Sequence, residues 1–179
     1  MKKILITVFL AITIAGCGVG NPKKASVAID PATAIKVQKL IPFAKGTPIA
    51  ANIINDCNLD NQLSEFIHAY AVGEGVGMIR KNVVTKDTKG KVLVVAITNA
   101  VSSGNAFIGH RKYTSIKGTL YDNGEKGASF TAARLSGGGA FSGFKSSCSV
   151  LGRTVKVLGH DVMLWLKNPS DGAHLGDHV

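Results

Sequence analysis

The sequence has no apolar run long enough to cross a membrane as a helix. Its longest apolar segment, residues 4–14, covers eleven residues, whereas a membrane-spanning helix needs about 20. The basic residues Lys2 and Lys3 come directly before this segment. A short basic head followed by a short apolar run is typical of an export signal.

Motifs for catalysis and for cofactor binding are also missing. Gly138 and Gly143 have the spacing of a Walker A loop, but Phe144 stands where that loop requires lysine. Ser142 lies one place away from the nucleophile-elbow pattern. The three cysteines form neither a Cys-x-x-Cys pair nor a zinc-ligand pattern. We therefore expect no enzyme activity, no cofactor and no metal site.

A lipid attachment signal follows the apolar run at once. Residues Ile14-Ala15-Gly16-Cys17 resemble the lipobox of bacterial lipoproteins. The resemblance implies that residues 1–16 are a signal peptide and that membrane lipid, diacylglycerol and palmitate, is joined to Cys17. Gly18 stands where enteric bacteria place an aspartate to retain lipoproteins in the inner membrane, so the resemblance favours the periplasmic face of the outer membrane. A plain secretory signal and an inner-membrane location are the alternatives.

The remaining chain is the right length for a single domain. Cleavage before Cys17 leaves 163 residues and lowers the formal net charge from +10 to +8. Residues 17–34 contain Gly, Asn, Pro and Lys without a sustained period, which indicates a lipidated flexible tether. Residues 35–167 form the expected periplasmic domain. Residues 168–179 are polar and are expected to form a disordered tail.

Hydrophobic periodicity predicts an α/β domain, an α+β sandwich with the element order β-α-β-β-β-α. Strands are expected over residues 35–43, 91–101, 112–121 and 126–135, and helices over residues 59–73 and 150–166. Asn123-Gly124 lies between two strand-like runs and predicts a hairpin. A mixed sheet of about four strands with two helices on one face satisfies this order.

Connection rules place the starts of both helices at one edge of this sheet, named here the top edge. With Cys17 acylated, Cys57 and Cys148 are the two remaining cysteines, in a compartment that oxidises thiols. Each lies at the start of a predicted helix, so a disulfide between them is expected. In the chain-entropy model it would contribute on the order of 4 kcal/mol. Two reactive thiols are the alternative.

The basic balance indicates an acidic partner, such as an anionic glycan or an acidic protein surface. DNA and other nucleic acids are poor candidates in the envelope. The expected top edge contains the segment 102–111, predicted as a loop, and the glycine-rich segment 136–148. We expect the partner-binding residues to be Phe107, His110, Arg111 and Lys145.

The glycine-rich turn at residues 104–111, the hairpin, the second glycine cluster at residues 136–141 and the closing helix resemble a group of uncharacterised bacterial outer-membrane lipoproteins. More distantly, the element order is similar to periplasmic lipoprotein domains that assist cell-wall synthases or exopolysaccharide export. These resemblances imply a non-catalytic accessory or binding module that contacts an anionic glycan or an envelope protein complex. The alternative is a structural subunit of a homo-oligomer, joined through an apolar sheet face of Val92, Val94 and Ala96.

Overall fold

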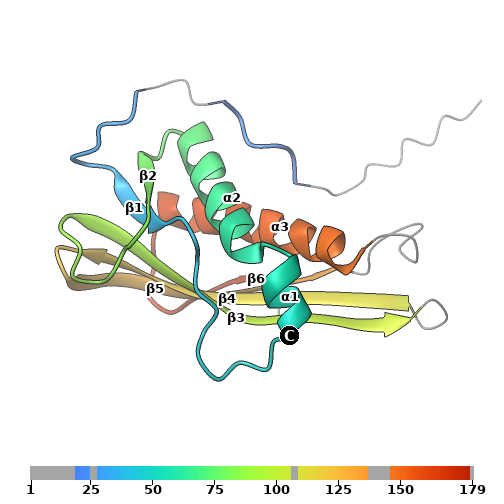
Figure 1. Cartoon of the computed structure of the whole chain (residues 1–179). Coiled ribbons are helices and arrows are strands. Elements are labelled where there is room, and N and C mark those ends of the chain that lie inside the picture. Colours follow the sequence, from blue (N-terminus) through green and yellow to red (C-terminus); the bar gives the residue numbers. More distant parts are fainter. Residues whose placement is uncertain (1–18, 25–27, 106–108, 137–145, 178–179) are drawn as a thin grey trace, which may run out of the picture.

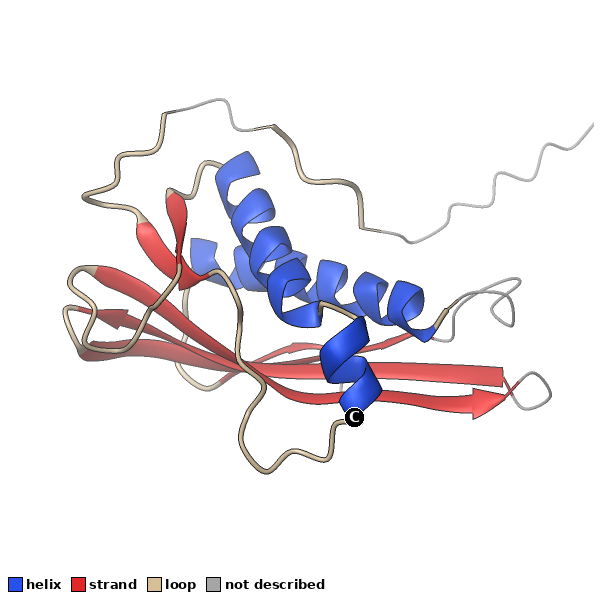
Figure 2. Ribbon diagram, in the orientation of Figure 1, coloured by secondary structure: helices blue, strands red, loops and turns tan. Residues whose placement is uncertain are grey.

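The computed structural model describes residues 19–24, 28–105, 109–136 and 146–177, and the side chains of residues 104–111 lie outside the description. The described residues form two layers, a twisted sheet and a helical layer that covers one face of it (Figures 1 and 2). In chain order the elements are β1 (Ile35–Gln38), α1 (Ala51–Asp56), α2 (Leu59–Gly73), β2 (Met78–Lys81), β3 (Lys91–Asn105), β4 (Gly109–Asp122), β5 (Glu125–Ser136), α3 (Ser147–Lys167) and β6 (Ala173–Gly176).

The sheet is mixed, as expected, with the strand order β2-β1-β3-β4-β5-β6. Strand β1 pairs in parallel with β3, and α2 lies between them in the chain. Strands β3, β4 and β5 are antiparallel neighbours. Between β4 and β5, Asn123 and Gly124 have φ values of 49° and 90°, the left-handed conformations of the predicted tight turn.

The expected count of four strands and two helices is wrong, because the described residues contain six strands and three helices. The additional elements α1, β2 and β6 have only four to six residues each, too few to show a hydrophobic period. Both short strands are stabilised by a neighbour, since β2 pairs with β1 and β6 pairs with β5. Tertiary pairing, not local propensity, therefore defines these strands.

The core lies between the sheet and helices α2 and α3. Side chains from β3, β4 and β5 that point to this face pack against apolar stripes on both helices. Phe130 from β5 packs edge-on against Trp165 from α3, with ring centroids 4.8 Å apart. Gly159 allows the helices to approach closely, because a Cβ atom there would lie 2.6 Å from the Cβ of Phe66.

The hairpin of β3 and β4 is longer than expected. The antiparallel ladder continues from Val101 and Tyr113 to Asn105 and Gly109, so most of the segment 102–111 that we expected to be a loop is strand. Its Ser, Gly and Asn residues have low strand propensity. Continuous pairing between the two strands overrides that preference.

Segments at both ends of the domain make contacts that the sequence did not predict. Part of the expected disordered tail forms β6, whose Leu175 packs against the core. Part of the expected flexible tether lies on the helical layer, where Tyr70 donates a hydrogen bond to the carbonyl of Gly20 at 2.6 Å and Lys23 pairs with Glu74 at 2.8 Å. Contacts with residues distant in the sequence order both segments.

The face of the sheet away from the helices is partly covered. Val84, from the segment between β2 and β3, is buried on this side beside Val94 and Tyr121. Val92 is fully buried, whereas Val94 and Ala96 are half-buried. The apolar face expected from these three residues is therefore smaller than the sequence suggests.

Candidate functional site

The predicted disulfide is present at the top edge. Cys57, at the end of α1, is bonded to Cys148 in the first turn of α3, and their Cα atoms are 4.8 Å apart. The start of α3 lies beside β3 at Ser102, and α1 and the start of α2 lie next to it (Figure 1). The bond fixes the start of α3 against the rest of the domain.

The other predicted site residues lie outside what the structure describes. Cys17, Phe107 and Lys145 are outside the described residues, and His110 and Arg111 belong to β4 but their side chains are outside the description. Lipidation at Cys17 and a partner-binding edge formed by the other four residues stay predictions. Described residues next to that edge form a polar cluster around Lys112.

Charge is distributed unevenly along the chain. All eleven Asp and Glu residues belong to the described part, and none falls in residues 88–121 or 126–160. Those two segments contain ten of the 21 Lys and Arg residues and supply almost all of β3, β4 and β5 and the first two-thirds of α3. The cations of this region therefore have few carboxylates to pair with.

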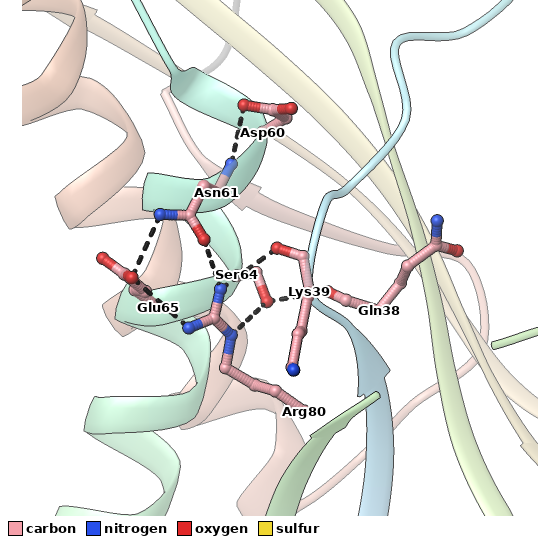
Figure 3. Close-up of polar contacts among 7 residues, drawn as sticks. All are labelled: Gln38, Lys39, Asp60, Asn61, Ser64, Glu65 and Arg80. Atoms are coloured by element: carbon pink, nitrogen blue, oxygen red, sulfur yellow. Dashed lines mark hydrogen bonds and ion pairs between the residues drawn. The ribbon is translucent and has the colours of Figure 1, made fainter. Parts of the chain in front are cut away.

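Arg80 shows how a largely buried cation is satisfied in this fold (Figure 3). From β2 it reaches α2, where its guanidinium donates to the Ser64 hydroxyl at 2.9 Å, to the Asn61 amide oxygen at 2.5 Å and to the Glu65 carboxylate at 3.3 Å. It also donates to the carbonyl of Lys39 at 3.1 Å. These bonds hold the β1–β2 edge of the sheet against α2, so we assign Arg80 a structural role.

Arg134 on β5 is satisfied in the same way. It donates two bonds to Asp161 of α3, both at 2.8 Å, and a third to Asp177 at 2.9 Å. The hydrogen bonds and charge of Asp161, together with those of Asp177, raise the pKa of the Arg134 guanidinium. Asp177 also accepts the backbone N–H of Leu135 at 2.8 Å. The cluster joins β5, β6 and α3.

Lys112 on β4 differs from both arginines. Its side chain is only 3% exposed, and its ammonium donates one bond, at 2.5 Å, to the Ser102 hydroxyl. No Asp or Glu side chain lies within 4 Å of the amine. Because every Asp and Glu residue belongs to the described part, this holds for all acidic side chains of the chain. Burial lowers the pKa of Lys112.

The surroundings of Lys112 favour negative charge. Ser102 bonds in turn to the hydroxyl of Ser147, the first residue of α3, at 2.8 Å. Ser146 caps this helix by accepting the N–H of Ser149, while the N–H groups of Ser147 and Cys148 meet no acceptor in the described part of the chain. A buried ammonium, two hydroxyls and two N–H groups that meet no acceptor among the described residues therefore lie together at the top edge.

The sequence places Lys112 beside Arg111 at the top edge, but Lys112 was not among the residues expected to bind the partner, although a further signal was present. Ile116 is a core residue, and period two along β4 places Thr114 and Lys112 on the same covered face. Thr114 is fully buried and bonds to Thr154 of α3 at 2.6 Å. The alternation therefore indicates that the Lys112 side chain is buried on the helical side of the sheet.

A second feature is a shallow trough on the open face of the sheet. It consists of two adjoining hollows of about 500 and 540 Å³ that share Lys117, Thr131 and His174. Tyr113 and Tyr121 lie at its two ends along β4, about 27 Å apart at the usual rise per strand residue. Hydroxyl groups line most of the length, contributed by Thr98, Ser115, Thr119, Ser129 and Thr131.

The trough contains one lysine, Lys117, and is bordered by two carboxylates. Lys117 is exposed and has no carboxylate partner. The two carboxylates that border the trough are already engaged, Asp171 by Lys126 and Ser129 and Asp177 by Arg134. The bonds from Lys126 and Ser129 lower the pKa of Asp171. A polar chain with negative charge would complement this surface.

The described residues contain neither a candidate membrane span nor a candidate metal centre. No helix there is long and apolar enough to cross a membrane. No group of three or more His, Cys, Asp or Glu side chains in the described part is arranged to hold a metal ion.

No family model matches the chain, and no curated protein matches it. Two solved structures are similar in outline. A minor lipoprotein from Acinetobacter baumannii is 14% identical, with a TM-score of 0.37 over 73% of this chain and 91% of that one. A PelC variant from Paraburkholderia phytofirmans, described as a dodecamer, is 11% identical, with a TM-score of 0.43 over 78% of this chain and 93% of that one. Neither likeness is close enough to assign a function to this chain.

Proposed function

We propose that this protein is a non-catalytic binding module of the bacterial envelope that holds an extended anionic glycan along the open face of its sheet. The trough along β4 is the observation that carries the proposal. Its length suits several sugar rings in a row, its hydroxyl groups can exchange hydrogen bonds with sugar hydroxyls, and Tyr113 and Tyr121 offer flat surfaces at its ends. Lys117 supplies the charge that selects an acidic sugar.

The anchoring part of the proposal comes from the sequence. Residues 1–16 would be removed and Cys17 acylated, which would tether the domain to the periplasmic face of the outer membrane. The disulfide between Cys57 and Cys148 supports an oxidising compartment. The contacts of residues 19–24 lie on the helical layer, which leaves the opposite, trough-bearing face of the sheet free for a partner.

Calorimetric titration of the purified protein tests the glycan proposal. The probes are galacturonate, a galacturonate pentamer and the neutral pentamer maltopentaose. We expect the charged pentamer to bind more tightly than either of the others, because it contacts the length of the trough and Lys117 together. Lys117→Ala should weaken this binding at least tenfold.

The matched control is Lys39→Ala, which removes an equally exposed charge outside the trough. It should leave the affinity unchanged. Equal affinity for charged and neutral pentamers, or equal losses in the two variants, would contradict the proposal. Binding of an envelope protein in place of the glycan would contradict the ligand class.

A homo-oligomer is the second candidate, favoured by the half-buried Val94 and Ala96 on the same face. Sedimentation at micromolar concentration separates the two candidates. A monomer that binds the pentamer supports the glycan module. A stable assembly that is broken by Val94→Lys supports the oligomer.

A further inference from the structure

We infer that the top edge contains a discrete binding site for a tetrahedral oxyanion, a phosphoryl or sulfate group, formed by Lys112, Ser102, Ser147 and the first N–H groups of α3. This site lies on the helical side of the sheet, where Lys112 and Ser102 meet α3. It is separate from the trough, which is on the opposite face. The inference does not depend on the proposed glycan function.

The first argument is the missing countercharge of Lys112. A buried ammonium is costly unless it is paired, and Arg80 and Arg134 in the same molecule have carboxylate partners. Two of the three N–H donors of Lys112 meet no acceptor in the described part of the chain. No acidic residue of the chain is placed to provide one. An anion from outside the chain would supply the missing countercharge.

The second argument is the convergence of donors on one place. Ser147 and Cys148 present N–H groups at the start of a helix of 21 residues, and a helix N-terminus attracts anions. The hydroxyls of Ser102 and Ser147 lie between those amides and the ammonium. An oxyanion with several oxygens can accept from the amides, the hydroxyls and Lys112 together, because its acceptor atoms point in several directions.

The cluster is accessible from one side. Lys112 is buried, but Ser102 and Ser147 are half-buried and Ser146 is exposed. The disulfide at Cys148 fixes the first turn of α3 beside the sheet, so the donors are held in place before an anion arrives. Such preorganisation lowers the cost of binding.

Amide NMR spectroscopy of the full protein tests the site directly. Inorganic phosphate is titrated at constant ionic strength while the signals of Ser147 and Cys148 are followed. We expect saturable shifts at both amides, and Lys112→Met should weaken the affinity at least tenfold. The matched control is Lys117→Met, which changes a lysine of the same strand on the opposite face and should leave phosphate binding unchanged.

The outcomes distinguish this site from the proposed glycan trough. Lys112→Met should weaken phosphate binding at least tenfold and leave binding of the galacturonate pentamer unchanged, and Lys117→Met should do the reverse. Absence of saturable shifts at Ser147 and Cys148, or equal phosphate affinity in wild type and Lys112→Met, would overturn the inference. Near-ultraviolet circular dichroism of each variant checks that it is folded.

Two sources of the phosphoryl group are separated by further titrations. Glucose 1-phosphate represents a soluble phosphosugar, and phosphatidylcholine vesicles with one-fifth phosphatidylglycerol represent a lipid surface. Shifts of both amides with either probe, lost in Lys112→Met, support the site and identify its source. Shifts with neither probe would contradict it.

Discussion

Lys112 and Arg134 lie on neighbouring strands, on the same side of the sheet, and both point toward α3. Arg134 is held by two carboxylates, and those carboxylates raise the pKa of its guanidinium. Lys112 is held by one hydroxyl, and burial lowers the pKa of its amine. The difference teaches that burial of a cation alone says little about its role. The identity of its partners separates a structural cation from one that is available to a ligand.

The disulfide should have the largest effect on stability, and it acts on the two cations differently. Replacing both Cys57 and Cys148 by serine opens a loop with a sequence separation of 91 residues and should lower the free energy of unfolding by about 4 kcal/mol. Urea denaturation measures this loss. Phosphate affinity at the first turn of α3 should fall as well, because Ser147 adjoins Cys148.

The Arg134–Asp161 pair lies further along α3 and should persist in the folded fraction of that double variant. Its presence can be checked by the guanidinium proton signal of Arg134. A double serine variant as stable as wild type would show that packing alone fixes the start of α3.

Arg134→Met should have the next largest effect. The change leaves Asp161, whose side chain is 9% exposed, without its cation, and should destabilise the protein by about 3 kcal/mol. The change also removes the hydrogen bond from Arg134 to Asp177, which should weaken the attachment of the end of β6. Thermal and urea unfolding measure the loss, and hydrogen exchange at residues 173–177 should become faster. A loss below about 0.5 kcal/mol would place Arg134 among ordinary surface ion pairs.

Lys112→Met should change stability in the opposite direction. The methionine keeps the length of the side chain and removes a buried charge that has no carboxylate partner, so the free energy of unfolding should rise by about 1 kcal/mol. Urea denaturation without phosphate or sulfate measures it. Destabilisation as large as that of Arg134→Met would show that Lys112 has a structural role like that of Arg134. The proposed difference between the two cations would then be wrong.

The smallest expected effect is on the pH dependence of the free energy of unfolding, which should differ between wild type and Lys112→Met. Burial lowers the pKa of Lys112 in the folded protein below its ordinary value of 10.5, so the unfolded chain binds this proton more tightly. Wild type should therefore become more stable, relative to Lys112→Met, as the pH rises through the folded pKa toward 10.5. The measurement is the difference in the free energy of unfolding between the two proteins across alkaline pH. The titrations of other groups cancel in this difference. A difference that does not change with pH would mean that the amine is well solvated.

Local patterns in the sequence were sufficient for much of the fold. The alternation in residues 112–121 and 126–135 and the Asn-Gly turn predicted the β4–β5 hairpin, and the stripe from Leu151 to Trp165 predicted α3. The parallel crossover from β1 to β3 followed from connection rules. Strands β2 and β6 could not be predicted, because four residues carry almost no periodic signal and their stability comes from a neighbouring strand.

The site was predicted less completely than the fold. Connection rules brought Cys57 and Cys148 together correctly. The neighbours of Lys112 could not be identified in the same way, because Ser102, Lys112 and Ser147 come from β3, β4 and α3. The trough was missed because hydroxyl-bearing residues at alternate strand positions look like an ordinary solvated face.

The sequence by itself determined the periodic elements, the hairpin turn, the scarcity of acidic residues around β3, β4 and α3, and the pair of cysteines available for a disulfide. Each of these depends on residue types at short or countable spacings. Only the tertiary structure decided which cations received a carboxylate, because that depends on which distant residues meet across the sheet and the helices. Arg134 contacts Asp161 and Asp177, whereas Lys112 contacts the hydroxyl of Ser102, which in turn bonds to Ser147 at the start of α3.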